Sequence, residues 1–310
     1  MAMDIPITQS KEWQNLQNDL KETSFFEIND DFQYLAILKN TPTGPYLYLP
    51  YGPFARELKS MKQALSSVEN LAKEHNCIFI RIEPQLENSN KYLPKNAKKS
   101  IDLNPKETWV LDLTGTEEDL KAKLPSRLLR YYKNREKQGL TIRTSKDSSD
   151  IAHLLRLQHA LADKKGINTF SEQYLETELK QPFATLYLVD YQDPDTKNTE
   201  VIAAGLVFDD ENTRYNLQGA QSEQGRKLHA TGILTIQLIL DAKEKQLKTF
   251  DFWGIAPEGA PDNHPWKGFT TFKKTFAGQE KDYAGTYDLI LRPFKYKTYQ
   301  CLRKINRIIH

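Results

Sequence analysis

The chain has 310 residues, of which 39% are hydrophobic and 27% are charged, and its formal net charge is +2. This length suits two lobes better than one, and the composition is typical of a globular protein rather than a disordered one. A charge so close to neutral excludes a globally basic nucleic-acid-binding protein. A nucleic-acid partner would therefore have to meet a local basic patch.

Two further classes are disfavoured by what the sequence lacks. No stretch approaches the roughly 20 consecutive apolar residues that a membrane-spanning helix needs, and residues 1–21 carry no apolar signal-peptide core. We therefore expect a cytoplasmic monomer. Cys77 and Cys301 are too few for a cysteine-based metal site, and the histidines form no H-E-x-x-H or similar pair. We predict no metal.

The spacing of apolar residues predicts alternating helices and strands. Helices are expected at 9–21, 57–75, 117–138, 150–164 and 231–246. Strands are expected at 32–38, 46–50, 77–82, 109–113, 186–191, 201–208, 214–218 and 249–253. The order strand, strand, helix, strand occurs once in each half of the chain. This pattern indicates a mixed α/β or α+β fold and does not by itself distinguish acetyltransferase-like lobes from other mixed folds.

Several familiar catalytic motifs are absent. The chain has no G-x-G-x-x-G or G-x-x-x-x-G-K-[ST] loop and no G-x-S-x-G nucleophile elbow. Where acyl-CoA acetyltransferases have a glycine-rich pyrophosphate loop, Gly225 and Gly232 are too far apart to place successive backbone N–H groups on a pyrophosphate. We predict no cofactor, and a CoA donor is disfavoured.

Three motifs follow one another late in the chain: F-D-F-W-G-I at 250–255, F-K-K-T-F at 272–276 and D-Y-A-G-T-Y-D at 282–288. Their order and spacing resemble the signature of the FemABX family, in which Y-D-[FL]-x-G-[IV] precedes F-K-x-x-F and Y-x-G-E-x-D. Further similarities extend over most of the chain. They are Gln9-Ser10 with Trp13, Y-L-P-Y-G-P at 48–53, R-I-E-P at 81–84, and Lys165-Gly166-Ile167 followed by Tyr174.

The resemblance implies two GNAT-like lobes, the lobes of acyl-CoA N-acyltransferases, with a central cleft. The first would span 1–143 with a return segment at 286–310, and the second would span 144–285. It also implies an aminoacyltransferase that moves an amino acid from aminoacyl-tRNA to the stem peptide of a peptidoglycan precursor, forming an interpeptide bridge. The precursor would be lipid-linked or nucleotide-linked.

By the same resemblance, Lys273 would face the tRNA 3′ end and stabilise the developing charge, and Phe272 would shape the pocket for the terminal adenosine. The chemistry is consistent with the absent motifs. The acceptor amine is itself the nucleophile, so the enzyme needs only positioning, a proton path and stabilisation of the oxyanion. The alternative is that Lys273 is a solvated loop lysine and Phe272 a core residue.

The candidate substrate-binding residues are Arg81, Glu83, Tyr174, Tyr215 and Trp253. The chain departs from the family pattern at three positions. Phe170 stands where better-known members have Arg, Thr286 stands for Glu, and Gln17 stands for Lys. Two of the replaced residues make phosphate-type contacts in enzymes that use nucleotide-linked precursors. Their loss favours a lipid-linked precursor or another acceptor.

Two segments are strongly basic. Residues 121–137 carry Arg127, Arg130 and Lys133, which could contact the phosphates of tRNA or could form the solvated face of a helix. Residues 294–310 combine an apolar stripe with lysines and arginines. This segment either lies on the inner face of an anionic membrane or packs on the first lobe.

Two other functions compete with aminoacyl transfer from tRNA. One is an acyl-CoA-dependent N-acyltransferase of the same fold that acts in polysaccharide or lipid synthesis. The other is a non-catalytic RNA-binding module that uses the basic segment.

Overall fold

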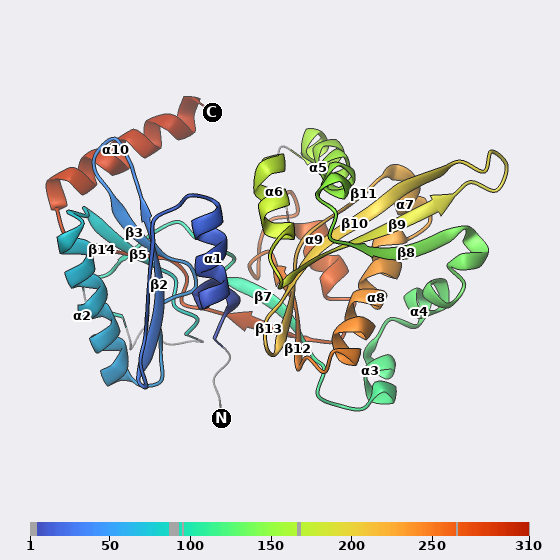
Figure 1. The fold of residues 1–310 in the computed structure, drawn as a ribbon, viewed down its shortest axis with the longest axis horizontal. Coiled ribbons are helices and arrows are strands. Elements are labelled where there is room, and N and C mark those ends of the chain that lie inside the picture. The colour runs from blue at the N-terminus through green and yellow to red at the C-terminus, as the bar shows by residue number, and fades with distance from the viewer. Residues whose placement is uncertain (1–4, 87–92, 95, 166–168, 265, 310) are drawn as a thin grey trace. The chain divides into compact units, whose positions relative to one another are not determined.

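The computed structural model describes residues 5–86, 93–94, 96–165, 169–264 and 266–309. The chain forms two compact units, unit 1 (Met1–Lys106 and Asp282–His310) and unit 2 (Glu107–Lys281). Each unit contains a mixed sheet with helices packed on it (Figure 1). The predicted α/β class with two lobes is confirmed.

In its described residues unit 1 has a seven-stranded sheet in the order β1-β2-β3-β5-β14-β6, with β4 paired to β2. Its elements are η1 (Ile7–Gln9), α1 (Lys11–Asp19), β1 (Ser24–Ile28), β2 (Phe32–Lys39), β3 (Tyr46–Leu49), β4 (Phe54–Ala55), α2 (Leu58–Glu74), β5 (Phe79–Ile82), β6 (Lys98–Lys99), β14 (Tyr287–Ile290) and α10 (Pro293–Ile309). β3 and β5 are parallel and are joined through α2.

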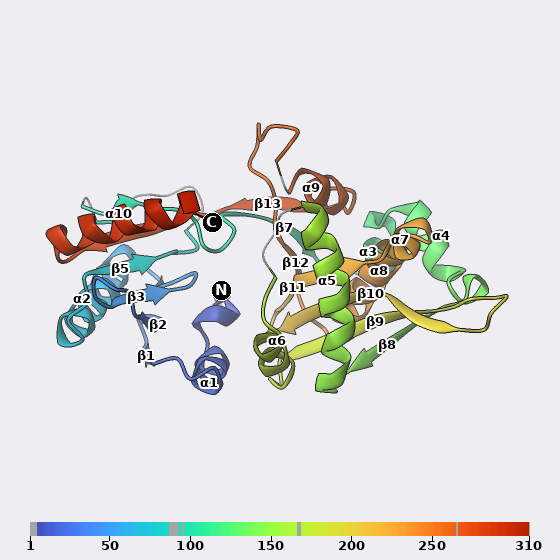
Figure 2. The same cartoon turned by 90° about the horizontal axis from the view of Figure 1, so that it is seen from above.

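Alternating side chains on these strands give unit 1 two apolar layers. Ile80 and Leu289 pack against residues of α2 in one cluster. Their sequence neighbours Phe79 and Ile290 pack with Tyr296 of α10 in another. α2 and α10 therefore cover opposite faces of the sheet (Figure 2).

Unit 2 has a seven-stranded sheet in its described residues, in the order β13-β7-β12-β11-β10-β9-β8. Its elements are β7 (Glu107–Asp112), α3 (Glu117–Lys123), α4 (Ser126–Lys133), η3 (Glu136–Gln138), β8 (Leu140–Ser145), η4 (Ser148–Asp150), α5 (Ile151–Lys165), α6 (Glu172–Leu179), β9 (Ala184–Gln192), β10 (Thr199–Asp209), β11 (Thr213–Gln221), α7 (Glu223–Lys227), α8 (Ala230–Glu244), β12 (Thr249–Gly254), α9 (Lys267–Lys273) and β13 (Gln279–Asp282). β11 and β12 are parallel and are joined through α8.

A β-bulge lets β11 present polar side chains to both faces of this sheet. Its pairing with β10 shifts in register at Leu206/Val207. Arg214, before the bulge, donates to the carbonyl oxygen of Leu238 in α8 at 2.9 Å. Gln218, beyond it, donates to Glu178 of α6 at 2.9 Å. α5 and α6 thus lie on the face opposite α8 (Figure 1).

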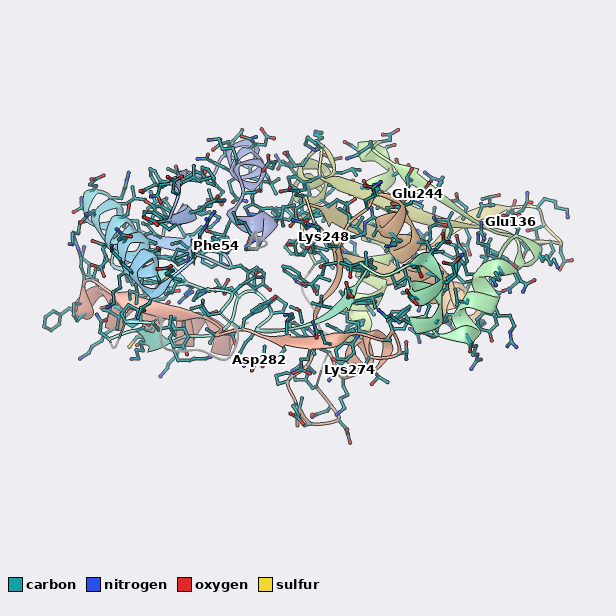
Figure 3. All side chains as sticks on the ribbon, turned by 90° about the horizontal axis from the view of Figure 1, so that it is seen from below. Phe54, Glu136, Glu244, Lys248, Lys274 and Asp282 are labelled. Atoms are coloured by element: carbon teal, nitrogen blue, oxygen red, sulfur yellow. The ribbon has the colours of Figure 1, made fainter. Side chains whose placement is uncertain are left out.

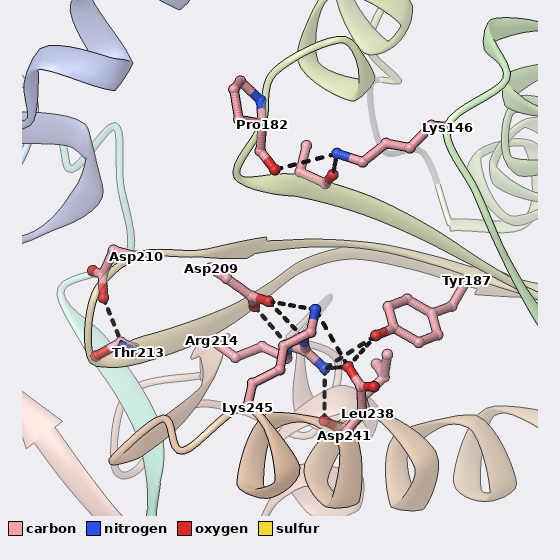
Figure 4. A network of polar contacts seen from close by, with 11 residues as sticks. Lys146, Pro182, Tyr187, Asp209, Asp210, Thr213, Arg214, Leu238, Asp241 and Lys245 are labelled. Carbon is pink, nitrogen blue, oxygen red and sulfur yellow. Dashed lines mark hydrogen bonds and ion pairs between the residues drawn. The ribbon is translucent and has the colours of Figure 1, made fainter.

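Arg214 is fully buried and organises the α8 face of unit 2 (Figure 4). Its guanidinium donates to Asp209 at 2.5 and 2.6 Å and to Asp241 at 2.7 Å. The Tyr187 hydroxyl donates to Asp241 as well. Because burial removes hydration from this cation, two carboxylates are needed to stabilise it.

The predicted order strand, strand, helix, strand occurs in both units, as β2-β3-α2-β5 and as β10-β11-α8-β12. In each unit the next strand of the sheet comes from the other half of the chain. β14 lies beside β5 although it follows unit 2 in sequence, and β7 lies beside β12 although it follows β5 in sequence. The two sheets therefore exchange one strand each.

This exchange places the division between the units after Lys106, whereas the sequence suggested a division after residue 143. The prediction of one helix over 117–138 is wrong. α3 ends at Lys123 and α4 begins at Ser126, because Pro125 lacks an N–H and Leu124 before it is extended, with ψ of 147°.

Candidate active site

The end of β12 is bent by a bulge that carries Trp253. Its pairing with β7 shifts in register between Asp251 and Gly254. Trp253 has φ of 66°, a left-handed conformation that costs a bulky residue about 1–2 kcal/mol. The buried Asp251 accepts a hydrogen bond from the Trp253 N–H at 2.7 Å. This bond helps to hold the unfavourable turn.

Lys273 approaches the same strand end from the last turn of α9. Its ammonium donates to the carbonyl oxygen of Gly254 at 2.6 Å. Within the described residues it forms no ion pair with a carboxylate. An ammonium group has three N–H donors, so Lys273 keeps donors for a bound acceptor. The segment around Lys273 is thus a short helix, α9, rather than a loop, and it places the lysine beside the end of β12.

Burial sets the charge behaviour of this pair. It lowers the pKa of Lys273 to about 8, and the Asp251 carboxylate acts in the opposite direction. Burial likewise raises the pKa of Asp251 to about 7, while the Trp253 N–H and the Lys273 charge act to lower it. The Thr108 hydroxyl acts in the same direction more weakly. Two coupled groups that titrate near neutrality are typical of functional sites.

Aromatic residues hold α9 in place. Phe276 is fully buried, and its ring centroid lies 5.4 Å from that of Phe272 and 5.1 Å from that of Phe252. Trp109 donates from its indole N–H to the Phe276 carbonyl oxygen at 3.0 Å. Phe272 is partly buried against the same core. Its contact with a tRNA adenosine stays a prediction.

Two predicted substrate-binding residues of unit 2 lie together at this edge. The rings of Tyr215 and Trp253 meet edge to face, with centroids 6.1 Å apart. Tyr215 is paired in register with Asp251, and its hydroxyl donates to Asp210 at 2.7 Å. Strands β11 and β12 therefore bring Tyr215, Trp253 and Asp251 to one place, to which α9 adds Lys273.

Tyr174 belongs to a different cluster, on α6. Burial raises the pKa of neighbouring Glu178 to about 8, against hydrogen bonds from Tyr174 and Gln218 that act to lower it. Gln158 continues the chain of hydrogen bonds, donating to Gln218 at 3.1 Å. The ring of Tyr174 stacks on the half-exposed Phe170 at 4.9 Å. The matched Gly166 and Ile167 lie outside the described residues.

Arg81 lies in the interior of unit 1, 1% exposed. It forms a bidentate ion pair with Asp288 at 2.8 and 2.9 Å and a hydrogen bond to Ser100 at 3.0 Å. The Tyr296 hydroxyl donates to Asp288 at 2.8 Å. These contacts join β5 to β14 and α10. Binding of substrate by Arg81 stays a prediction.

Glu83 is also buried and accepts hydrogen bonds within unit 1. Its carboxylate accepts from Tyr48, Asn104 and Thr286 side chains at 2.7, 2.8 and 2.7 Å. The backbone N–H groups of Leu103 and Asn104 donate to it at 3.0 and 3.2 Å. Thr286, one of the three departures from the family pattern, is therefore in direct contact with Glu83. Substrate binding by Glu83 likewise stays a prediction.

The N-terminal motif has a structural explanation. Ser10 caps α1 by accepting from the Trp13 N–H at 3.1 Å. The buried Gln9 side chain donates to the Pro50 carbonyl oxygen at 2.7 Å and accepts from Leu35 N–H at 2.9 Å. A Cβ at Gly52 would lie 2.2 Å from the Gln9 side chain. The two motifs thus fit one another. Gln17 is buried in α1.

The predicted phosphate-binding residues Arg127, Arg130 and Lys133 are exposed on α4. Both arginines lie over the ring of Tyr131, with Cζ 5.5 and 5.7 Å from its centroid. Tyr131 stacks on His229, which precedes α8, at 4.5 Å. Leucines on the other side of this helix face the core, since α4 packs on α8 through Leu128. α4 thus has both the exposed basic face and the core face.

Over the described residues, no cluster of three or more His, Cys, Asp or Glu could hold a metal ion. No described helix has the length and apolar character needed to cross a bilayer.

The sequence motifs did not reveal the partners of Lys273. Asp251 belongs to the F-D-F-W-G-I motif, but its coupling to Lys273 depends on the bulge, which the motif does not reveal. Glu178 was missed because an acidic residue on a helix normally indicates a solvated face. Its position three residues after the apolar Leu175, on the buried side of α6, was the available signal.

Residues 187–304, which include the whole candidate active site of β12 and α9, match the model of the FemAB family. A crystal structure of FemX has the same fold, with a TM-score of 0.80, 15% sequence identity and coverage of 94% of each chain. An L-PGS from Bacillus licheniformis gives a TM-score of 0.58 at 14% identity, covering 93% of this chain and 94% of that one. The C-terminal domain of a putative lysylphosphatidylglycerol synthetase from Agrobacterium fabrum gives 0.57 at 13% identity, covering 95% and 92%.

No curated protein matches by sequence. At these identities the solved structures show the fold, which is the two-lobed fold of FemX, and the family match adds residues 187–304. Residues 187–304 therefore resemble the FemAB family and the whole chain has the fold of FemX, in agreement with the resemblance that the sequence motifs implied.

Proposed function

We propose that this protein is an aminoacyltransferase that takes its amino acid from aminoacyl-tRNA. The match of residues 187–304 to the FemAB family and the FemX-like fold support aminoacyl transfer in cell-wall or lipid synthesis. The single observation that carries the mechanism is the Lys273 ammonium. It is partly buried, bonded to the Gly254 carbonyl oxygen and left with N–H donors for another acceptor.

The reaction needs little more than such a group. The acceptor amine attacks the carbonyl carbon of the aminoacyl ester, the carbonyl oxygen becomes an oxyanion, and the ester C–O bond then breaks to release the tRNA 3′ oxygen. The amine loses one proton and the leaving oxygen gains one. Lys273 would donate a hydrogen bond to the oxyanion, and a cation in a desolvated site acts more strongly than in bulk water.

For the acceptor we propose the stem peptide of a peptidoglycan precursor, in lipid-linked form. The fold is most similar to FemX among the structures named above. The likeness to L-PGS and to a putative lysylphosphatidylglycerol synthetase makes phosphatidylglycerol the second acceptor to test. Incubation with charged tRNA pools and either acceptor, read by mass spectrometry, tests both. Absence of aminoacylated product with every tRNA pool and both acceptors would contradict the proposal.

A lipid-linked acceptor requires contact with a membrane surface, and we propose α10 for this contact, on the cytoplasmic side where aminoacyl-tRNA is found. Phe294 is 87% exposed, Leu302 is 39% exposed, and Lys295 and Lys297 are exposed beside them. Residues 289–310 contain no Asp or Glu. Such a surface suits anionic headgroups. Phe294→Ala should reduce co-sedimentation with phosphatidylglycerol vesicles, and equal sedimentation of variant and wild type would refute this contact.

A further inference from the structure

The carboxylate of Asp251 is buried beside the candidate active site and contacts it. It follows the apolar Phe250 in β12 and is 5% exposed. Unlike the buried Asp288, which pairs with Arg81 at 2.8 Å, Asp251 forms no direct ion pair within the described residues. A buried carboxylate without a cation in contact is costly, so its presence here calls for an explanation.

The contacts of Asp251 and Lys273 meet within four consecutive residues of β12, 251–254. Asp251 Oδ1 accepts the Trp253 N–H at 2.7 Å, which fixes Trp253 in the left-handed conformation. Gly254, the next residue, then presents its carbonyl oxygen to Lys273 Nζ at 2.6 Å. The carboxylate thus acts on the lysine through the backbone and through its charge.

We propose that Asp251 is a positioning residue for Lys273, holding the bulge that anchors the ammonium and supplying the negative charge that keeps it protonated. The relevance of this pair to transfer rests on the proposed function. The pair itself can be tested without it.

The other charged groups on the surrounding elements are engaged elsewhere. On β11, Arg214 pairs with Asp209 and Asp241, and Tyr215 donates to Asp210. On α9 and at its end, Lys267 pairs with Asp262 and Lys274 pairs with Glu280 of β13. On β7, Glu107 has a polar partner of its own. Asp251 is the charged group that acts on the pKa of Lys273. A change in the titration of Lys273 therefore reports on Asp251.

Asp251→Asn is the informative variant, because the amide oxygen can still accept the Trp253 N–H while the charge is gone. Asp112→Asn is a matched control. Asp112, on the adjacent β7, accepts the N–H of the residue two positions later, Thr114, at 2.9 Å, and it is exposed. It has the local hydrogen bond without the coupling to Lys273.

The measurement is the rate at which acetic anhydride labels Lys273 as a function of pH, quantified by peptide mass spectrometry without any substrate. Lys274 serves as an internal reference. Loss of the carboxylate should lower the pKa of Lys273, so the free amine should react roughly fivefold faster at pH 7 in Asp251→Asn. Asp112→Asn should label as wild type does. Equal labelling of Lys273 in all three proteins would overturn the proposal.

Two further readouts keep the outcome decisive. Should Asp251→Asn not fold, the wild type alone must show a second inflection near pH 7 in the Lys273 profile and none for Lys274, because coupled groups titrate in two steps. A single-step profile would refute the coupling. Where transfer is observed, its high-pH limit should move to lower pH in Asp251→Asn. Failure of transfer in every protein, with the labelling result intact, would count against the proposed function and leave the pair standing.

Discussion

Unit 2 contains one buried cation, Arg214, and one partly buried cation, Lys273, and their surroundings differ. Arg214 donates to two carboxylates and a backbone carbonyl, and these contacts raise its pKa despite burial. Lys273 donates to one backbone carbonyl, has its carboxylate at a distance, and has its pKa lowered to about 8 by burial. A cation whose donors are all engaged can serve the fold, whereas a cation with donors to spare can serve a reaction. Arg81 in unit 1 belongs with Arg214.

The largest effect should come from removing the lysine charge. Lys273→Met keeps most of the side-chain stem, so the transfer rate should fall by roughly two to three orders of magnitude with folding nearly intact. Steady-state assays measure the transfer rate, and circular dichroism shows whether the variant is folded.

Lys274→Met is the matched control. Lys274 is exposed (Figure 3) and pairs with Glu280 at 3.0 Å, so its loss should change the rate little. Equal rates for both variants and wild type would make Lys273 an ordinary lysine and leave the functional proposal resting on fold alone.

Arg81→Met should instead reduce the stability of the fold. It leaves Asp288 buried without its cation, so the free energy of unfolding should fall by about 3–5 kcal/mol. Urea denaturation measures this. The double variant Arg81→Met/Asp288→Leu should recover part of the loss, since no uncompensated charge remains. A single variant as stable as wild type would contradict a structural role for Arg81.

The pH dependence separates the two kinds of cation further. Transfer should decline as pH rises through about 8, because Lys273 loses its proton there. The free energy of unfolding should instead rise with pH. Between pH 8 and about 10.4 the unfolded chain keeps the proton that the folded chain has released, so wild type should gain stability relative to Lys273→Met. Denaturation at pH 7 and pH 9.5 tests this, and a constant difference would show that Lys273 titrates normally.

The smallest effect should come from the exposed cations of α4. Replacing Arg127, Arg130 and Lys133 by Glu should weaken tRNA binding and flatten its salt dependence, with little change in stability. Filter binding at several salt concentrations checks this. Lys137→Glu, in η3 outside α4, is the control. An unaltered salt slope in the triple variant would mean that the basic face is only solvated.

Local patterns in the sequence were sufficient for much of the fold. Apolar spacing predicted α2, α8 and most strands, and a repeated order predicted two lobes. The pairing of β7 with β12 joins residues far apart in the chain, so periodicity could not locate the boundary between the units. At the site, the motif around Lys273 was recognisable, but the burial of Asp251 and Glu178 depends on tertiary packing. Pro125 was the one local signal that could have divided the basic helix.

The exchanged strands also bear on how the chain is made. Unit 2 is continuous in sequence, so it can complete its sheet while still emerging from the ribosome. Unit 1 begins earlier but must wait for β14, and until then β5 lacks its neighbour on one side. The half of the protein that is synthesised first is therefore the half that finishes folding last, and a ribosome that stalls before Asp282 leaves an exposed strand edge for chaperones to protect.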